Sequence, residues 1–114
     1  YFQLAHCIEV SLESLTQAAE QGDARAQAGL AKIYDEGRRT PQDYNKAAEW
    51  FIKAADQGDA QAQCDLGLMH YKGHGIAQDH QKAFEWWTRA AEQGYVRAQK
   101  NLEAMAAKGL PRKN

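Results

Sequence analysis

Histidine is the residue type in this chain that could hold a metal ion. His70 and His74 lie four positions apart, a spacing at which two imidazoles on one helical face can share a zinc ion. Gly73 stands between them, and a glycine that closes a helical pattern indicates that His74 lies beyond the helix carrying His70. We therefore expect no metal site. His70 is predicted to be a core residue and His74 a loop residue, and His6 and His80 complete the set.

Two cysteines could supply a disulfide or a nucleophile. Cys7 and Cys64 have no cysteine at close spacing, so the sequence predicts neither a disulfide framework nor a zinc set. A catalytic thiol needs a base, and no motif ties a histidine or carboxylate to Cys64. A lone cysteine in a helical pattern usually behaves as a small hydrophobe. Both cysteines are predicted to be free thiols without a catalytic role.

Aromatic residues could form a platform on which bases or sugars stack. The candidates are Trp50, Phe51, Phe84, Trp86 and Trp87. They recur at one phase of two helical patterns, where a repeating unit must bury its bulk. Core packing is predicted instead, and replacement of Trp50 by alanine should cost roughly 3 to 5 kcal/mol.

Composition excludes several classes of protein. The net charge of -1 and the pI of about 6.5 leave no overall field that attracts nucleic acid or an anionic membrane. The mean hydropathy of -0.74 and the lack of a long uncharged apolar run give no candidate for membrane insertion. No Walker loop, dinucleotide-binding glycine pattern or serine elbow occurs. We expect a soluble protein without cofactor, in the cytoplasm, the periplasm or the extracellular space, and composition does not decide among these compartments.

An internal repeat accounts for the glycines. Similar segments begin at Ala18, Ala54 and Ala90, one every 36 residues. The positions that keep this step are Gly22, Gly58 and Gly94; Ala26, Ala62 and Ala98; Gln27, Gln63 and Gln99; Leu30, Leu66 and Leu102; and Gly37, Gly73 and Gly109. Within each segment the apolar residues follow helical spacing. Each unit is therefore predicted to be a pair of helices.

Capping residues set the expected ends of these helices. A glycine suits the left-handed position after a helix, and an aspartate suits the N-cap of the next one. The aspartates in question are Asp23, Asp43, Asp59 and Asp79. The predicted helices cover residues 7–21, 24–36, 43–57, 60–72, 79–93 and 95–108.

These elements predict one domain, residues 1–114, with an all-α fold. It is an α-solenoid of about six helices in antiparallel hairpins, with repeats at about 24–59 and 60–95 and partial units at 7–23 and 96–110. In the last helix Glu103 stands where earlier units have Ala31 and Gly67, as expected of a terminal helix that faces water.

The segment from Ala60 to Gly94 closely resembles the Sel-one-like repeat (SLR), a relative of the tetratricopeptide repeat. The motifs that carry the resemblance are the alanine-glutamine pair, Leu66-Gly67, Gly73 with Gly75, Gln78-Asp79, Lys82-Ala83 and Trp86-Trp87. The resemblance covers nearly the whole chain. It implies a right-handed superhelix that acts as a scaffold for protein complexes. Arg39 departs from the pattern in place of the second loop glycine, and the paired cysteines of a cysteine-rich branch are missing.

The resemblance also implies that the first helix of each unit lines a concave groove. The inward positions would then be Arg25, Ala28, Lys32, Asp35 and Glu36, then Gln61, Cys64, Leu68, Tyr71 and Lys72, then Arg97, Lys100, Ala104, Ala107 and Lys108. Basic side chains outnumber acidic ones, so a segment carrying carboxylates is the expected partner. The binding residues would be Arg25, Lys32, Gln61, Leu68, Tyr71, Lys72, Arg97 and Lys100. The alternative is an ordinary solvated helix face.

The function that follows is a scaffold or adaptor that binds a peptide or protein partner in its concave groove, without catalysis. One alternative is a hydrolase of cell-wall or β-lactam substrates, as proposed for cysteine-rich relatives. Another is a structural module that associates weakly with itself through the apolar stripes of its end helices.

Overall fold

The computed structural model describes residues 12–37 and 40–110, and these ranges are helical apart from short connections. The helices with complete bounds are α2 (Ala24–Glu36), α3 (Tyr44–Asp56), α4 (Ala60–Lys72), α5 (His80–Glu92) and α6 (Val96–Ala107). Residues 12–20 are also helical, and the earlier part of the predicted first helix lies outside the described residues. No strand occurs within these ranges, so the predicted all-α fold is confirmed.

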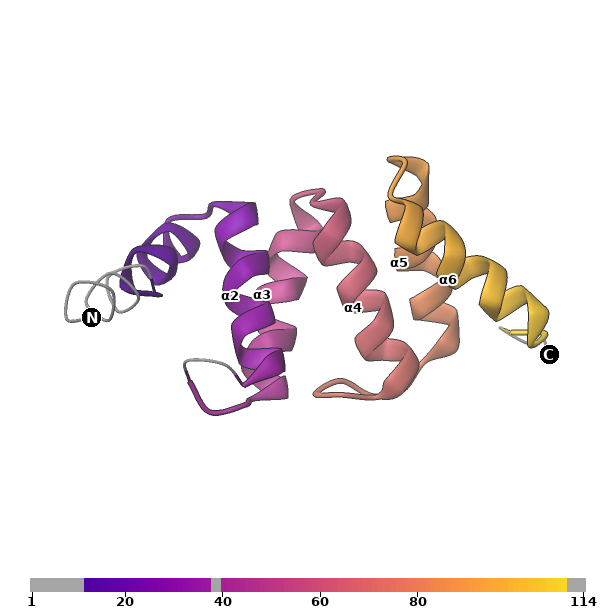
Figure 1. Ribbon diagram of the computed structural model, residues 1–114, viewed down its shortest axis with the longest axis horizontal. Coiled ribbons are helices and arrows are strands. Elements are labelled where there is room, and N and C mark those ends of the chain that lie inside the picture. The colour runs from indigo at the N-terminus through magenta and orange to yellow at the C-terminus, as the bar shows by residue number, and fades with distance from the viewer. Residues whose placement is uncertain (1–11, 38–39, 111–114) are drawn as a thin grey trace, which may run out of the picture.

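The helices form a solenoid of stacked hairpins. Each packs chiefly against its neighbours in chain order, α2 on α3, α3 on α4, α4 on α5 and α5 on α6. Figure 1 shows the hairpins side by side along the long axis, with residues 12–20 at one end and α6 at the other. The molecule measures 56 × 25 × 23 Å, and its radius of gyration is 15.3 Å. A compact chain of this length would have a radius of about 13 Å, so the stack is elongated.

Aspartate caps begin the helices where the sequence predicts them. The Asp23 carboxylate accepts hydrogen bonds from the backbone N–H groups of Arg25 and Ala26, at 3.0 and 3.3 Å. Asp43 and Asp59 each accept one such bond at the start of α3 and α4, and Asp79 accepts two at the start of α5. These bonds satisfy amide groups that have no partner inside the helix. The N-cap of α6 is Tyr95, whose side chain makes no such bond.

Two glycines allow the close approaches on which the stack depends. A Cβ on Gly67 of α4 would lie 2.6 Å from the Trp87 ring of α5, so glycine is required for these helices to touch. Gly75, with a φ of +73°, lies directly against the Tyr44 carbonyl, where a side chain could not fit. This second contact brings the loop after α4 onto the start of α3.

A buried glutamine in each full repeat joins successive hairpins. The Gln27 side chain donates to the Ala19 carbonyl at 3.0 Å and accepts from the Gln57 amide at 2.8 Å. The same two bonds recur one repeat later around Gln63, at 3.2 and 3.0 Å. The repeated glutamine therefore satisfies a carbonyl of the preceding helix and orders the turn that follows the next one.

The aromatic residues divide between the core and the surface. Phe51 and Trp87 are fully buried, as predicted. Trp50 and Trp86 are only partly buried, and Phe84 is 39% exposed, so core packing is wrong for Phe84.

Each partly buried tryptophan makes a cation–π contact with a basic side chain. Lys53 lies over Trp50 with its Nζ 4.6 Å from the ring centroid, and the Arg89 guanidinium lies 4.7 Å from that of Trp86. Because part of each ring remains in contact with water, the cost of 3 to 5 kcal/mol expected for Trp50→Ala is too high. A value of about 1 to 2 kcal/mol fits a half-buried ring.

Candidate functional site

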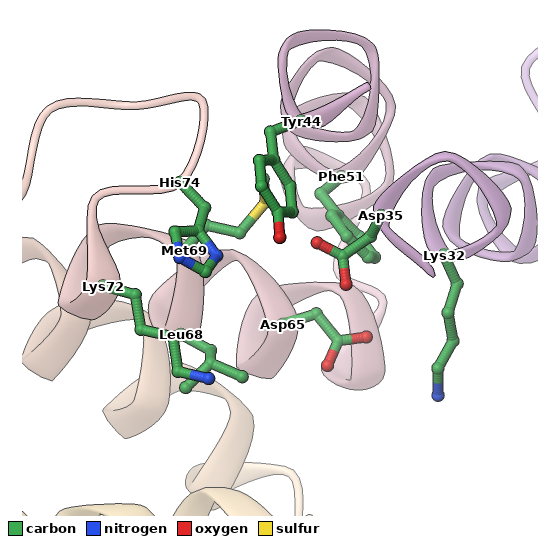
Figure 2. A pocket seen from close by; sticks show the side chains of 9 residues that line it. All are labelled: Lys32, Asp35, Tyr44, Phe51, Asp65, Leu68, Met69, Lys72 and His74. Carbon is green, nitrogen blue, oxygen red and sulfur yellow. The ribbon is translucent and has the colours of Figure 1, made fainter. Parts of the chain in front are cut away.

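A cavity of about 170 Å³ opens between α2 and α4, the first helices of the two full repeats, over the start and middle of α3. We call it the first notch, and Figure 2 shows the side chains around it. They are Lys32, Asp35, Tyr44, Phe51, Asp65, Leu68, Met69, Lys72 and His74. Phe51 and Met69 are buried and form its apolar floor, while the polar groups come from three elements and the loop after α4.

Burial affects both carboxylates of the first notch, and Asp65 more strongly than Asp35. Burial raises the pKa of Asp65 to about 6, and its Oδ2 atom is buried without a hydrogen-bond partner. Burial is also the main cause of the raised pKa of Asp35, since the attraction of His74, Lys72 and Lys32 only partly offsets it. A buried carboxylate oxygen that lacks a donor costs free energy, so Asp65 leaves the notch with an unsatisfied polar group.

An aromatic pair forms one wall of the first notch. The rings of Tyr44 and His74 stack with centroids 4.5 Å apart and an interplanar angle of 23°. The Tyr44 hydroxyl also accepts a hydrogen bond from the Gln42 side chain at 3.2 Å. Gly75 makes this wall possible, because it lets the loop that carries His74 lie against Tyr44.

A second notch, of about 120 Å³, lies one repeat further along, between α4 and α6. It is lined by Leu68, Tyr71, Trp87, Asn101, Ala104, Met105 and Lys108. These positions correspond to first-notch residues at a step of 36: Tyr71 takes the place of Asp35, and Asn101 that of Asp65. The two notches therefore share a backbone but differ in chemistry, and Leu68 borders both.

Four of the eight predicted binding residues line the notches: Lys32, Leu68, Tyr71 and Lys72. Arg25 and Gln61 instead line a shallow hollow beside the turns that precede α4 and α6. Arg97 and Lys100 are exposed on α6, and neither lines a notch. The structure thus places half of the predicted binding residues at the notches and the other half elsewhere on the surface.

For two positions, the expectation that they face the concave groove is wrong. Cys64 is 1% exposed and Ala28 is 6% exposed, so both belong to the core. Each lies on the face of its helix that packs against the neighbouring hairpin.

Sequence reasoning missed Asp65, Tyr44 and His74 as part of the site. Asp65 occupies a position that holds Gly29 and Asn101 in the other units, so the repeat gives it no shared signal. Tyr44 and His74 come from a second helix and a loop, whereas the expected groove used first helices alone. Gly75 was the available signal, since a loop glycine at a close approach marks where the loop contacts another element.

Cys64 and His70, considered earlier for catalysis and for metal binding, occupy structural positions. Cys64 is a buried free thiol, and desolvation raises its pKa to about 11. His70 is also buried, and burial lowers its pKa, which favours the neutral ring. No group of three or more potential metal ligands occurs within residues 12–37 and 40–110.

A larger hollow, of about 440 Å³, lies on the second-helix side of the solenoid, beside Ile52, Ile76 and Trp86. It is wider and more open than the notches.

None of the helices in the described part of the chain is long and apolar enough to cross a bilayer.

Comparison with known proteins finds sequence and structural relatives. The family profile of the Sel1 repeat matches residues 24–59 and 60–95. The secretory immunoglobulin A-binding protein EsiB of Escherichia coli O6:H1 is 45% identical over 42 residues, which are 37% of this chain and 9% of that protein. The match thus spans a small part of its length.

Solved structures with the same fold have similar sequences. A Sel1 repeat protein from Oxalobacter formigenes superposes with a TM-score of 0.77 at 42% identity, over 79% of this chain and 68% of that one. The protective antigen c5321 of uropathogenic E. coli, which displays an SLR fold, gives a TM-score of 0.82 at 42% identity, over 86% of this chain and 21% of that one. Helicobacter pylori cysteine rich protein B gives a TM-score of 0.75 at 25% identity, over 80% of this chain and 68% of that one.

Proposed function

Because this chain belongs to the Sel1 repeat family, whose members are generally scaffolds for protein interactions, we propose that it is a protein-binding module. The whole chain works as one repeat domain, and a peptide or protein segment lies along α2, α4 and α6. The SLR neighbours support this function, and EsiB is by its name a binder of a protein. We take from EsiB only the class of partner, which is a protein.

The observation that carries the proposal is the pair of notches built on the same positions of successive repeats. Their outer edges hold side chains with room to meet a partner, and Leu68, 36% exposed, lies between them. Successive pockets on one face are suited to alternate side chains of an extended or helical segment. Affinity should be modest, on the order of micromolar, because few side chains can act as anchors.

Basic side chains surround this row and favour a partner with carboxylates. They are Arg25, Lys32, Lys72, Arg97, Lys100 and Lys108. Exposed charges of this kind affect the association rate and the register of a partner more than its affinity. An acidic segment is therefore the proposed partner overall, and its contacts at the notches determine how tightly it binds.

A matched pair of substitutions tests the location of binding. Leu68→Glu places a charge between the notches, while Ile52→Glu places one at a similarly exposed position of α3 (40% exposed). Partners captured from native extract by the unmodified protein should be retained by Ile52→Glu and lost by Leu68→Glu. Capture that survives Leu68→Glu and fails with Ile52→Glu would place the interface on the second-helix side.

We propose no catalysis. Cys64 is the nucleophile that a thiol hydrolase would need, but it is buried and its raised pKa of about 11 keeps it protonated near neutral pH. Purified protein should give no turnover of peptidoglycan or β-lactam substrates. Turnover that disappears in Cys64→Ser would contradict this view and favour the hydrolase.

A further inference from the structure

On the basis of the proposed interaction function, we infer that the first notch receives a basic side chain of the partner, and that arginine is preferred to lysine. The carboxylates of Asp35 and Asp65 are the groups that bind it. The inference concerns one position of the partner, so it is compatible with a segment that is acidic elsewhere.

The polar groups of the first notch converge on one space. Figure 2 shows the carboxylates of Asp35 and Asp65 and the hydroxyl of Tyr44 directed to the region between α2 and α4. The Oδ2 atom of Asp65 has no solvent contact and no donor. A guanidinium carries five N–H donors in a planar fork, which matches two carboxylates and a hydroxyl better than any neutral side chain does.

The protein's own cations only partly balance the charges of Asp35 and Asp65. In Figure 2 the ammonium groups of Lys32 and Lys72 lie on opposite sides of the notch, to either side of the two carboxylates. Burial still outweighs the attraction of Lys32 and Arg97 in setting the pKa of Asp65. A cation that entered the notch would therefore meet a desolvated negative charge that is incompletely balanced.

The wall and floor of the notch favour arginine over lysine. The Tyr44 and His74 rings form a stacked aromatic face, and Phe51 and Met69 supply an apolar floor for a methylene chain. A planar guanidinium can stack on such a face while its edge reaches carboxylates, whereas an ammonium is a compact and strongly hydrated charge.

The second notch provides a comparison inside the same molecule. Tyr71 and Asn101 replace the two carboxylates there, and Trp87 and Met105 line it. This notch lacks the negative charge for a cation and suits an apolar side chain. The binding of a basic residue should thus be restricted to the first notch.

The probes for the test are N-acetyl-arginine amide and N-acetyl-citrulline amide, which have nearly the same shape but differ in charge. Titration into the 15N-labelled chain should shift amide signals around Asp35, Tyr44 and Asp65 with the arginine compound only. Asp65→Asn should weaken this binding by roughly tenfold, the effect of losing one charged hydrogen-bond acceptor. Asparagine already occupies the equivalent position 101, so the variant should fold.

Asp56→Asn is the matched control, because Asp56 is an exposed carboxylate outside the notch. It should bind the arginine compound as the unmodified protein does. Equal binding of the citrulline compound, or binding unaffected by Asp65→Asn, would overturn the inference. So would a response of the same signals to magnesium chloride but not to the arginine compound, since that result indicates a metal site.

A peptide-display selection separates this inference from the proposed function. Peptides that bind the unmodified chain but not Leu68→Glu should contain an arginine or a lysine. Removal of that basic residue should weaken binding to the unmodified chain but not to Asp65→Asn. Peptides that depend on Leu68 without any basic preference would overturn the inference and leave the proposed function standing. Failure to select any peptide that depends on Leu68 would count against both.

Discussion

Asp65 is a residue whose position lowers the stability of the fold. Its pKa rises from 3.8 to about 6 on burial, so the folded state binds a proton more tightly than the unfolded state does. The contribution of Asp65 to the free energy of unfolding is therefore most favourable below about pH 4 and falls as the pH rises to about 6. Above that range the full cost of the buried charge is present.

Asp65→Asn should accordingly stabilise the protein near neutral pH. The expected gain in the free energy of unfolding is on the order of 2 kcal/mol, and it should vanish at acidic pH. Urea denaturation of both proteins at pH values below about 4 and above about 6 measures the difference. Equal denaturation curves for Asp65→Asn and the unmodified protein at every pH would contradict the prediction.

Cys64 should be inert in the folded protein. The rise of its pKa from 9.0 to about 11 reduces the thiolate fraction about a hundredfold, and burial restricts reagent access further. In a Cys7→Ser background, Ellman's reagent should label Cys64 more than about a hundredfold faster in urea than in buffer. Similar rates in the two solutions would show that the thiol is accessible in the native state.

The candidate site was predictable only where residues follow the repeat. Lys32, Leu68, Tyr71 and Lys72 occupy first-helix positions that the resemblance assigns to the inner face, and the structure places them at the notches. Asp65 could not be found this way. Its importance depends on burial and on missing donors, which are properties of the packed structure and not of the sequence pattern.

At the scale of helices, the contact between α4 and α5 depends on Gly67. Alanine is normally better than glycine in a helix by about 1 kcal/mol. At position 67, however, the added methyl group would lie 2.6 Å from the Trp87 ring, so Gly67→Ala should destabilise the protein by about 1 to 3 kcal/mol. Thermal denaturation measures the change.

Gly29 of α2 supplies the control for this prediction. A Cβ there would lie 3.7 Å from Leu15, an ordinary contact, so Gly29→Ala should be neutral or stabilising. A loss of stability in Gly29→Ala equal to that of Gly67→Ala would show that the close approach to Trp87 is not the cause.

The glutamine connections give a second prediction for the helices. Gln63→Ala removes a buried side chain that bonds to the Ala55 carbonyl and to Gln93, so it should cost about 1 to 2 kcal/mol. Gln99 occupies the equivalent position of α6 but is exposed and makes only a 3.4 Å bond, so Gln99→Ala should change stability by less than about 0.5 kcal/mol. Chemical denaturation of the two variants compares them directly.

The helices themselves followed closely from the sequence. The predicted range 24–36 is the observed α2, and the predicted 60–72 is the observed α4. Aspartate caps and left-handed glycines are local devices, so a sequence shows them without knowledge of the packing. The partial exposure of Trp50 and Trp86 could not be predicted, because it depends on how far neighbouring hairpins separate on the second-helix side.

At the scale of the molecule, Glu103 places a charge on the face of α6 that corresponds to the faces of α2 and α4 packed against second helices. The equivalent positions, Ala31 and Gly67, are buried against second helices. A hairpin packed there would bury an unpaired carboxylate, at a cost of several kcal/mol. Glu103→Ala should therefore increase self-association, which light scattering at two concentrations measures. Association of the unmodified protein that Glu103→Ala leaves unchanged would favour the self-assembling alternative through another surface.

The chain-order packing of the helices has a mechanical consequence. Residues 12–20 and α6 lie at opposite ends of a 56 Å axis (Figure 1), and each helix is held chiefly by the next. A pulling force between the ends would load every hairpin interface in series, so no single contact spans the distance to resist it. The chain would then behave as a soft spring that yields hairpin by hairpin, and stretching would open the notches before the helices unwind.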